Sequence, residues 1–399
     1  MVNSLEREEP HYFGAGPALL PTLVLQQAAY DLLNYQGSGL GIGEISHRSK
    51  PATDVINQSK ARLVQLLDIP EDTHEIFFMQ GGGTTGFSSI ASNLMANFLN
   101  RKGKSGKAGY VITGSWSQKS YEELNRLGVD TEIIANAANA RGSNSTKFGT
   151  IPNVDSWSNN VSKDDTAYIY YCDNETVHGV EFQEFPFEKY EGIPIVADMS
   201  SNFLSKQIPI SKYGLIMAGA QKNVGIAGLT IYIIRKDLIP QPSDHKLLIE
   251  NGIPITPIAF HYPSVIKNNS AYNTIPIFTL QVINLVLENL ITVKGGLQAQ
   301  EDLNRKKAEK LYSVLDKYPE IFNLPVEKSV RSKMNVVFTI SGGEIKEGIF
   351  LKEAEKRYKL TGLKGHRSVG GMRASLYNAV DTTSVDLLCK FIEEFAKEN

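Results

Sequence analysis

A single lysine, Lys222, stands in a stretch of the chain that is otherwise largely apolar. Residues 213–217 before it and residues 225–234 after it have the composition of buried strands. A cation is costly to bury unless it is paired or chemically used. The position of Lys222 therefore raises the question of whether its amine takes part in a reaction.

Three glycines, at residues 81–83, stand where a strand-like run, 76–79, gives way to a helical pattern, 88–99. At such a junction, backbone N–H groups can approach an anion, and the helix N-terminus favours phosphate. No Gly-Lys-Ser/Thr follows, and the GxGxxG spacing is missing, so the motif is neither a Walker loop nor a dinucleotide fingerprint. The alternative is a tight turn that binds no ligand.

Asp198 directly follows the apolar run 193–197, at the kind of strand end where α/β enzymes place ligands. Taken alone, it is more often a helix cap or a turn former. Together with a phosphate-binding turn and Lys222, it fits pyridoxal phosphate, which needs a phosphate site, a carboxylate on its ring nitrogen and a lysine for an imine linkage. Trp116, after the run 109–113, offers an aromatic face that could stack on the ring or serve in the core.

The elements that must position these residues alternate between strand and helix from residue 22 to residue 265. This pattern predicts an α/β fold with a largely parallel, buried sheet and helices on both faces. The expected strands are 76–79, 109–113, 167–171, 193–197 and 229–234, with a further strand-like run at 213–217. The expected helices are 23–33, 55–67, 88–99 and 118–127. Residues 136–160, rich in Asn, Ser, Gly and Ala, predict a surface loop.

The chain changes character beyond residue 270, where long helical patterns prevail. We expect helices at 278–293, 297–318, 347–358 and 384–397, and strands at 335–340 and 372–377. A length of 399 residues exceeds what one hydrophobic core usually holds. The prediction is a large domain at 17–268 and a smaller α+β domain at 269–399, with residues 1–16 packing on the smaller one.

The composition excludes several classes of partner and site. A formal net charge of −2 argues against nucleic acid. The two cysteines, Cys172 and Cys389, offer neither a disulfide framework nor metal-ligand spacing, which suits a reducing, cytoplasmic environment and predicts no metal. The first ten residues are polar and resemble no targeting signal, and no apolar run approaches the length of a membrane span.

Several segments resemble one family closely. GLIMAGAQKNVGIAGL at 214–229 is similar to the cofactor-lysine segment of the phosphoserine aminotransferases, which are fold-type-I pyridoxal-phosphate enzymes of the class V aminotransferase family. The other similar segments are HYFGAGPALLP (11–21), EISHRSK (44–50), YCDNETVHG (171–179), VADMSSNFLS (196–205) and LKGHRSVGGMRASLYNA (363–379). The resemblance extends over nearly the whole chain. It implies a large domain with a mostly parallel seven-stranded sheet and a smaller α+β domain.

The resemblance implies a role for each matching residue in the cofactor site. Lys222 forms the imine with pyridoxal phosphate, Asp198 pairs with the ring nitrogen, and Trp116 stacks on the ring. The other cofactor-binding residues it implies are Thr176 at the ring hydroxyl, and Gly83, Thr84, Gln221, Asn273 and Thr274 at the phosphate. Since the family takes the last two from the partner subunit, the match implies an obligate homodimer with shared active sites.

The resemblance also implies the reaction, a ping-pong transamination between L-glutamate and 3-phosphohydroxypyruvate that makes phosphoserine for serine biosynthesis. Such substrates carry separated anionic groups, which the guanidinium fork suits. The matching residues are Arg373, as the α-carboxylate anchor, and Arg48, His366 and Arg367, as side-chain anchors. Without the resemblance, these four would be taken as solvated. Some bacterial members have an arginine where this chain has Thr84. If that arginine helps to hold the distal anion of the substrate, this chain has one cation fewer there, for which other basic residues could compensate.

Three rival interpretations account for these residues less well. A cysteine desulfurase needs a mobile, accessible cysteine, whereas Cys172 ends a strand-like run and Cys389 lies in an amphipathic helical pattern. Other small-acid aminotransferases, such as serine–glyoxylate types, stay open, although the HRSVGGMR segment favours a phosphorylated substrate. A catalytically inactive binding protein with the same fold is disfavoured by the intact lysine, aspartate and arginine set.

Overall fold

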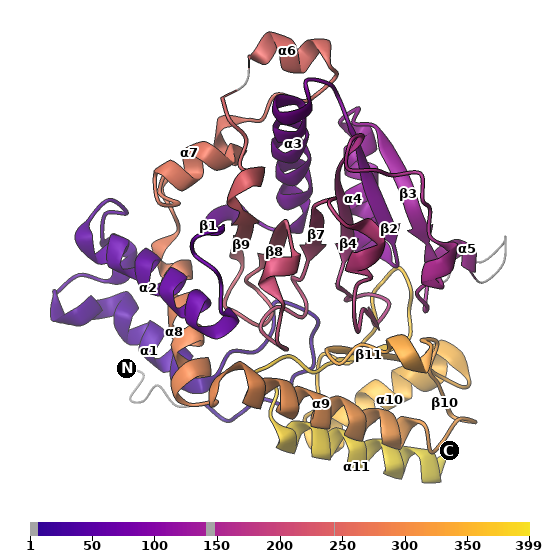
Figure 1. The fold of residues 1–399 in the computed structure, drawn as a ribbon. Coiled ribbons are helices and arrows are strands. Elements are labelled where there is room, and N and C mark those ends of the chain that lie inside the picture. Colours follow the sequence, from indigo (N-terminus) through magenta and orange to yellow (C-terminus); the bar gives the residue numbers. More distant parts are fainter. Residues whose placement is uncertain (1–6, 141–147, 243) are drawn as a thin grey trace.

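The computed structural model describes residues 7–140, 148–242 and 244–399 of the chain. Residues 1–6 of the predicted N-terminal segment and 141–147 of the predicted loop lie outside the described residues. Figure 1 shows a central sheet with helices on both sides and a group of C-terminal helices below it.

The central sheet has seven strands in the order β1-β9-β8-β7-β4-β2-β3. Its members are β1 (His74–Gly81), β2 (Lys107–Ile112), β3 (Thr131–Asn136), β4 (Thr166–Cys172), β7 (Ile195–Asp198), β8 (Leu215–Gly219) and β9 (Gly228–Arg235). β9 is antiparallel to both of its neighbours, and the other pairs of adjacent strands are parallel. The predicted α/β fold with a mostly parallel sheet is confirmed.

Both faces of this sheet are covered, because alternate strand residues are apolar on each side. Phe77 belongs to one buried cluster, which includes residues of α3 (Gly83–Lys102) and α4 (Ser115–Arg126). Phe78 belongs to the opposite cluster, which includes α2 (Lys50–Leu67) and α8 (Ile277–Thr292). The strands of the central sheet are therefore held between two apolar layers.

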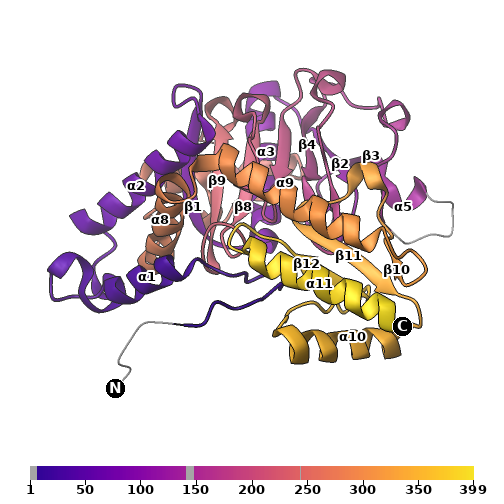
Figure 2. The same ribbon diagram turned by 90° about the horizontal axis from the view of Figure 1, so that it is seen from below.

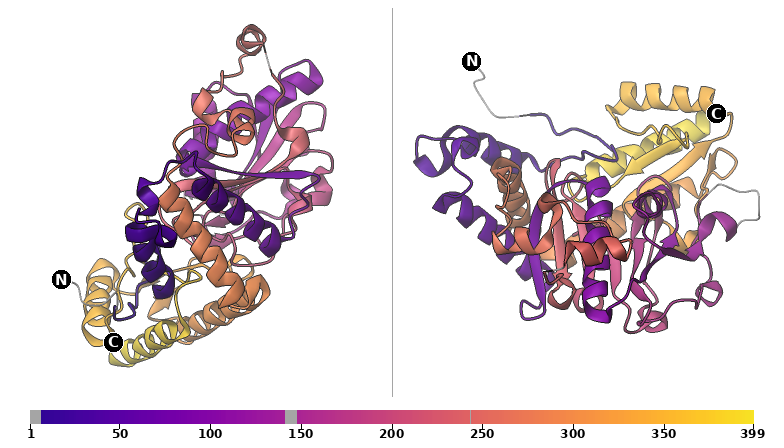
Figure 3. Two further views of the ribbon diagram at one scale, coloured as in Figure 1. Left: turned by 90° about the vertical axis from the view of Figure 1, so that its left-hand side faces the viewer. Right: turned by 90° about the horizontal axis from the view of Figure 1, so that it is seen from above.

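The C-terminal part forms its own layer of helices on a small antiparallel sheet, β10-β11-β12. Its elements are β10 (Phe322–Asn323), β11 (Asn335–Ile340), β12 (Met372–Ser375), α9 (Gly296–Leu315), α10 (Gly343–Tyr358) and α11 (Thr382–Glu398). The three helices lie side by side in Figure 2 and at one end of the molecule in the left view of Figure 3.

A separate buried cluster of apolar residues holds this C-terminal layer together, and Phe13 from the N-terminal segment is part of it. The backbone N–H of Phe13 donates to Thr361 O at 2.9 Å, and Figure 2 shows the indigo segment extending toward α11. Helix α8, although it follows residue 269, packs in the cluster of the large sheet. The domain division at residues 268 and 269 stays a prediction.

Most predicted elements are present; several extend further than predicted, whereas α9, β7 and β12 are shorter. Helix α2 begins at Lys50, because the Ser49 side chain accepts a hydrogen bond from Ala52 N and Pro51 suits the first turn. The edge strand β3 was not predicted; its side chain Ile133 is exposed, so it lacks the buried pattern of the other strands. The short helix α5 lies within the predicted loop. The remaining helices and strands are α1 (Thr22–Asn34), α5 (Ala137–Ala140), α6 (His245–Glu250), α7 (Tyr262–Lys267), β5 (Asn174–Glu175) and β6 (Val180–Glu181).

Within the described residues, no single helix combines the length and apolar character needed to cross a membrane. Helices α8 and α9 meet that requirement only as a pair bent by 86° at their junction. Most of α8 is buried against α1, α2 and the sheet, as the core helix of a folded domain would be.

Candidate active site

The carboxyl ends of five parallel strands, β1, β2, β4, β7 and β8, meet around a cavity of about 480 Å³. Each predicted cofactor residue near the cavity stands within a few residues of one of these ends. The cavity is lined by Ala15, Gly16, Pro17, Gly81, Gly82, Gly83, Trp116, Cys172, Asn174, Thr176, Val177, Asp198, Ser200, Ser201, Gln221, Lys222, Ala227, Gly228, His366 and Arg373. The sheet topology thus brings together residues that lie far apart in the sequence.

Lys222 lies in the turn between β8 and β9, with only 8% of its surface exposed. Its Nζ donates a hydrogen bond to Thr176 Oγ1 at 2.7 Å. Burial lowers the pKa of Lys222 to about 8, although the nearby Asp198 carboxylate favours the charged form. The amine is therefore neutral in a sizeable fraction of molecules slightly above neutral pH.

Asp198, at the end of β7, is buried and held in place by Ser200. Its Oδ1 accepts hydrogen bonds from Ser200 N at 2.9 Å and from Ser200 Oγ at 2.6 Å. Burial raises the pKa of Asp198, while these bonds and the Lys222 ammonium favour its ionised form. Ser200 Oγ also accepts from Gly219 N at 3.0 Å, which ties the end of β8 to the same carboxylate.

Trp116 follows β2 and stands in the first turn of α4, on the wall of the cavity. Lys222 Nζ lies 5.9 Å from the centroid of its ring. Its indole Nε1 is buried and has no hydrogen-bond partner among the described residues. A core tryptophan normally satisfies this group, whereas here it is buried without a partner in a side chain that borders the cavity.

The glycine turn at residues 81–83 forms the wall next to the start of α3. Gly81 has a φ of +126°, and a Cβ there would lie 2.0 Å from Thr85 Oγ1. The first N–H groups of α3 have no acceptor within the helix, as at every helix start. Gln221 lines the same cavity. Thr84, the other predicted phosphate ligand, is exposed in the first turn of α3 and is not among the lining residues described.

These residues fit pyridoxal phosphate. The start of α3 suits a phosphate, the Asp198 carboxylate suits a protonated ring nitrogen, and the Trp116 face borders the same space as Lys222 Nζ. The unsatisfied indole nitrogen and the glycine turn are features of this chain that a purely structural core would not need. The lysine, the aspartate, the tryptophan and the glycine turn that the sequence predicted for the cofactor therefore line one contiguous cavity.

The predicted substrate anchors divide into two groups. Arg373 and His366 line the cavity and also an adjoining one of about 540 Å³. Arg373 Nη1 donates to Thr176 O at 3.2 Å, which places the guanidinium next to Lys222. Arg48 and Arg367 are exposed and do not belong to the described lining of the cofactor cavity.

Asn273 and Thr274 are also exposed and stand outside the described lining of this chain's cavity. Thr274 O accepts a hydrogen bond from Gln80 Nε2 at 2.7 Å, so the segment lies beside the strand that leads into the glycine turn. Neither side chain reaches the cofactor cavity within one chain.

Several residues that line the cavity had no role predicted from the sequence. Gly16, in the N-terminal segment, is one of them, and a Cβ there would lie 3.3 Å from Lys222 Cγ. Ala18 N donates to Gln221 O at 2.9 Å, which fixes this segment against the lysine turn. The signal was present in the HYFGAGPALLP segment, but nothing local in it indicates a contact with residues two hundred positions away.

Comparison with known proteins agrees with this geometry. A family model described as aminotransferase class-V matches residues 11–388. The phosphoserine aminotransferase of Saccharomyces cerevisiae is 56% identical, covering 99% of this chain and 100% of the relative. The one from Bacillus cereus is 42% identical, covering 98% and 99%.

Solved structures give the same result. The phosphoserine aminotransferase from Bacillus circulans subsp. alkalophilus has a TM-score of 0.86 at 36% identity, covering 98% of this chain and 99% of that one. The pyridoxal-phosphate-bound enzyme from Trichomonas vaginalis has a TM-score of 0.84 at 36% identity, covering 96% and 100%. The predicted fold type and the predicted cofactor, pyridoxal phosphate, are confirmed. The chain belongs to the class-V aminotransferases and, among them, to the phosphoserine aminotransferases.

Proposed function

We propose that this chain transfers the amino group of L-glutamate to 3-phosphohydroxypyruvate, giving O-phospho-L-serine and 2-oxoglutarate for serine biosynthesis. The observation that supports this most strongly is the convergence of Lys222, Asp198 and the glycine turn on one cavity that Arg373 also lines. Names of relatives at 56% and 42% identity over nearly the full chain agree with the proposal.

Pyridoxal phosphate, when bound, supplies an electron-withdrawing ring that stabilises negative charge at the substrate α-carbon. The chain supplies the base. Because the pKa of Lys222 is about 8, its Nζ can accept a proton as the neutral amine and return it as the ammonium near neutral pH. Thr176 Oγ1, 2.7 Å from Nζ, orients the amine. We assign Asp198 to the ring nitrogen, Trp116 to the ring face, and Gly83, Thr84 and Gln221 to the phosphate.

Both half-reactions use the same cavity, so the same residues must bind glutamate and the keto acid in turn. We assign the common α-carboxylate to Arg373, whose guanidinium is placed next to Lys222 by its bond to Thr176 O. His366 lies on the same wall and we assign it to the distal anion. Water is displaced from this wall when the substrate binds, which strengthens each charge-assisted bond.

We further propose a homodimer with shared active sites. Asn273, Thr274 and Arg48 are exposed and outside this chain's described cavity lining, which is what residues acting in a second subunit require. Exposed apolar side chains on and after α1 supply a surface for that subunit. They are Leu23, Tyr30, Leu32, Leu33 and Leu40. Arg367 is also exposed, and we keep it as a proposed substrate anchor. We also propose the two-domain division and a cytoplasmic location.

Cys172 supports a transaminase over a desulfurase. It lines the cavity, but its thiol is buried and donates to Asn174 O at 3.3 Å. Burial raises the pKa of the Cys172 thiol well above its usual value, so the thiolate is scarce. A desulfurase needs a reactive, mobile thiol, and this one is neither.

A coupled assay with glutamate and a panel of keto acids, phosphorylated and not, tests the proposal. We expect turnover with 3-phosphohydroxypyruvate and little with hydroxypyruvate, since only the former offers the second strong anion to the basic groups. Lys222→Ala should show no steady-state turnover. Equal use of hydroxypyruvate would overturn the substrate assignment, and near-normal turnover by Lys222→Ala would overturn the site.

A further inference from the structure

The turn that carries Thr176 is bonded to four different parts of the molecule. Asn174 Nδ2 donates to Ser201 Oγ at 2.7 Å and to Asn335 Oδ1, on β11, at 2.8 Å. Thr176 accepts from Lys222 through its hydroxyl and from Arg373 through its carbonyl oxygen. The turn therefore connects the catalytic lysine, the proposed carboxylate anchor and the C-terminal sheet.

Between these two residues stands Glu175, a fully buried carboxylate without an assigned role. Its Oε2 accepts from Trp116 N at 3.0 Å. Its Oε1 accepts from Ser117 N at 2.9 Å and from Ser117 Oγ at 2.6 Å. Both backbone donors belong to the first turn of α4, where N–H groups have no acceptor inside the helix and the helix field favours an anion.

Two neighbouring contacts show that this part of the fold is built around the carboxylate. A Cβ on Gly114 would lie 2.4 Å from Glu175 Cδ, so the glutamate side chain occupies the space that any side chain at position 114 would need. Ser115 Oγ lies 2.8 Å from His178 Nε2, which joins α4 to the same turn again. Three consecutive residues of α4 are thus held by the turn 175–178.

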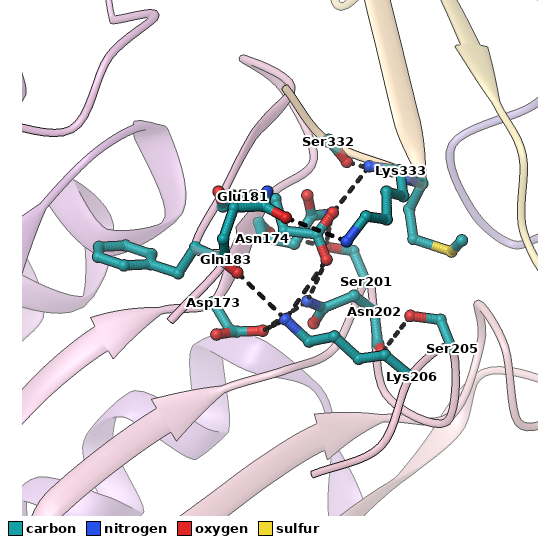
Figure 4. Close-up of polar contacts among 12 residues, drawn as sticks. Asp173, Asn174, Glu181, Gln183, Ser201, Asn202, Ser205, Lys206, Ser332 and Lys333 are labelled. Atoms are coloured by element: carbon teal, nitrogen blue, oxygen red, sulfur yellow. Dashed lines mark hydrogen bonds and ion pairs between the residues drawn. The ribbon is translucent and has the colours of Figure 1, made fainter. Parts of the chain in front are cut away.

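The other end of the turn is anchored independently. Lys206 Nζ lies 2.8 Å from Asp173 Oδ2 and 3.5 Å from Glu181 Oε1, and Glu181 Oε2 accepts from Lys333 N at 2.7 Å (Figure 4). Asn202 Nδ2 donates to the same two carboxylates. Since both flanks of the turn are fixed, the Glu175 carboxylate has a defined place from which to hold α4.

We infer that Glu175 is a positioning residue of the active site: its carboxylate holds the first turn of α4 so that the Trp116 ring keeps a fixed place relative to Thr176 and Lys222. The inference rests on the proposed function, in which Trp116 contacts the cofactor ring. It explains why a charged side chain is buried directly beside Thr176. Glu175 itself does not line the cavity described above.

The test compares wild type with Glu175→Gln, which keeps the shape of the side chain but turns one acceptor into a donor. Hydrogen–deuterium exchange of the peptide that covers residues 115–118 reports the bonds directly. The second readout is the visible circular dichroism of bound pyridoxal phosphate, with its dissociation constant. We expect about tenfold faster exchange, a smaller dichroic band per bound cofactor and about tenfold weaker binding, as for the loss of a charge-assisted bond.

Asp31→Asn is the matched control. Asp31 is a buried carboxylate on α1 that accepts from Gln27 and Gln281 Nε2, and it touches neither α4 nor the cavity. It should leave the exchange, the dichroic band and the binding constant unchanged. A change of equal size in the control would show that any lost buried charge has this effect, and would overturn the inference.

Two further outcomes are decisive. Faster exchange in Glu175→Gln with a wild-type dichroic band and binding constant would reduce Glu175 to a helix cap and overturn the inference. A wild-type protein that binds pyridoxal phosphate but transaminates none of the keto acids would overturn the proposed function alone. If Glu175→Gln does not fold, Gly114→Ala takes its place. The new Cβ displaces the carboxylate, so the same three changes are expected, and wild-type behaviour would contradict the inference.

Discussion

At the scale of single residues, the protonation of Lys222 couples catalysis to stability. The pKa of this lysine is about 8 in the folded chain, because it is buried, against an ordinary value of 10.5. Between these two values the unfolded chain binds more protons than the folded one, so stability rises with pH in this window. Below pH 8 both states are protonated, and the penalty for burying the charge is fully present.

We therefore predict that the cofactor-free protein gains stability relative to Lys222→Met as pH rises from about 8 to about 10. The gain attributable to Lys222 is about 3 kcal/mol at most, at about 1.4 kcal/mol per unit of pKa shift. Urea unfolding at a series of pH values measures it. Titrations of other groups occur in both proteins and cancel in the difference. A difference that stays flat across this window would contradict the lowered pKa.

The second prediction at this scale concerns the role of Arg373 in substrate binding. Arg373→Ala should lower kcat/KM for glutamate by roughly 10- to 100-fold, the equivalent of one lost charge-assisted contact, while the binding constant of the cofactor changes little. Arg373→Lys keeps the charge but not the fork and should lie between the two. Steady-state kinetics and spectroscopic cofactor titration separate the effects. Equal losses of substrate and cofactor affinity would contradict the assignment as carboxylate anchor.

At the scale of elements, a second buried lysine joins α9 to the segment after β12. Lys307 Nζ donates to three carbonyl oxygens, at 3.1 Å to Leu376, 3.0 Å to Tyr377 and 2.9 Å to Val380. Burial lowers the pKa of Lys307 to about 7. The three acceptors match the three N–H groups of the ammonium, whereas the neutral amine keeps only two of them. Lys307 thus satisfies the carbonyl groups of the segment that follows β12.

Lys307→Met keeps the length of the side chain and removes its donors. We expect it to lower the free energy of unfolding by about 2 kcal/mol, because buried carbonyls lose their partner. Lys310→Met is the control, since Lys310 is exposed on the same helix and pairs with Asp386; it should change stability by no more than about 0.5 kcal/mol. Urea unfolding at pH 7.5 compares them. Equal effects of the two variants would show that the three carbonyl contacts do not matter.

The elements themselves were predictable where burial gives a clear periodic pattern. The strands that became β1, β2, β4, β7, β8 and β9 are apolar because both faces of the sheet are covered. β3 was missed because it is an edge strand with polar residues and an exposed Ile133. Helix starts were placed too late at α2, α3 and α10, because capping serines and glycines carry no hydrophobic signal.

At the scale of the whole molecule, subunit sharing can be tested by complementation. Asn273 and Thr274 lie outside the cavity lining described for their own chain, and we propose that they act in the partner's site. A Lys222→Ala chain and an Asn273→Ala/Thr274→Ala chain are co-expressed with different tags, and the mixed dimer is purified. If the residues act across the interface, one site of the mixed dimer is complete, and activity should approach about half that of wild type.

The parental variants provide the controls, since homodimers of each should be strongly impaired. If Asn273 and Thr274 acted within their own chain, the mixed dimer would contain no complete site and would be no more active than its parents. Size-exclusion chromatography with light scattering establishes the dimer independently. A monomer with full activity would contradict the shared site at once.

The sequence by itself determined the cofactor and the fold class. A lysine after one strand, an aspartate after another and a glycine turn before a helix are local features, and each lies at a strand end because strands and helices alternate. The family resemblance extended these to a substrate. None of this required knowing which residues touch.

The tertiary structure decided which of the basic residues share the cavity with Lys222. Arg373 and His366 do, whereas Arg48 and Arg367 are exposed, although nothing in the residue types separates these two pairs. The tertiary structure also brought the Glu175 carboxylate into contact with Ser117 in the first turn of α4, although the two residues are 58 positions apart in the chain. Contacts over such separations depend on strand order and on the packing of whole elements, and no local pattern encodes them.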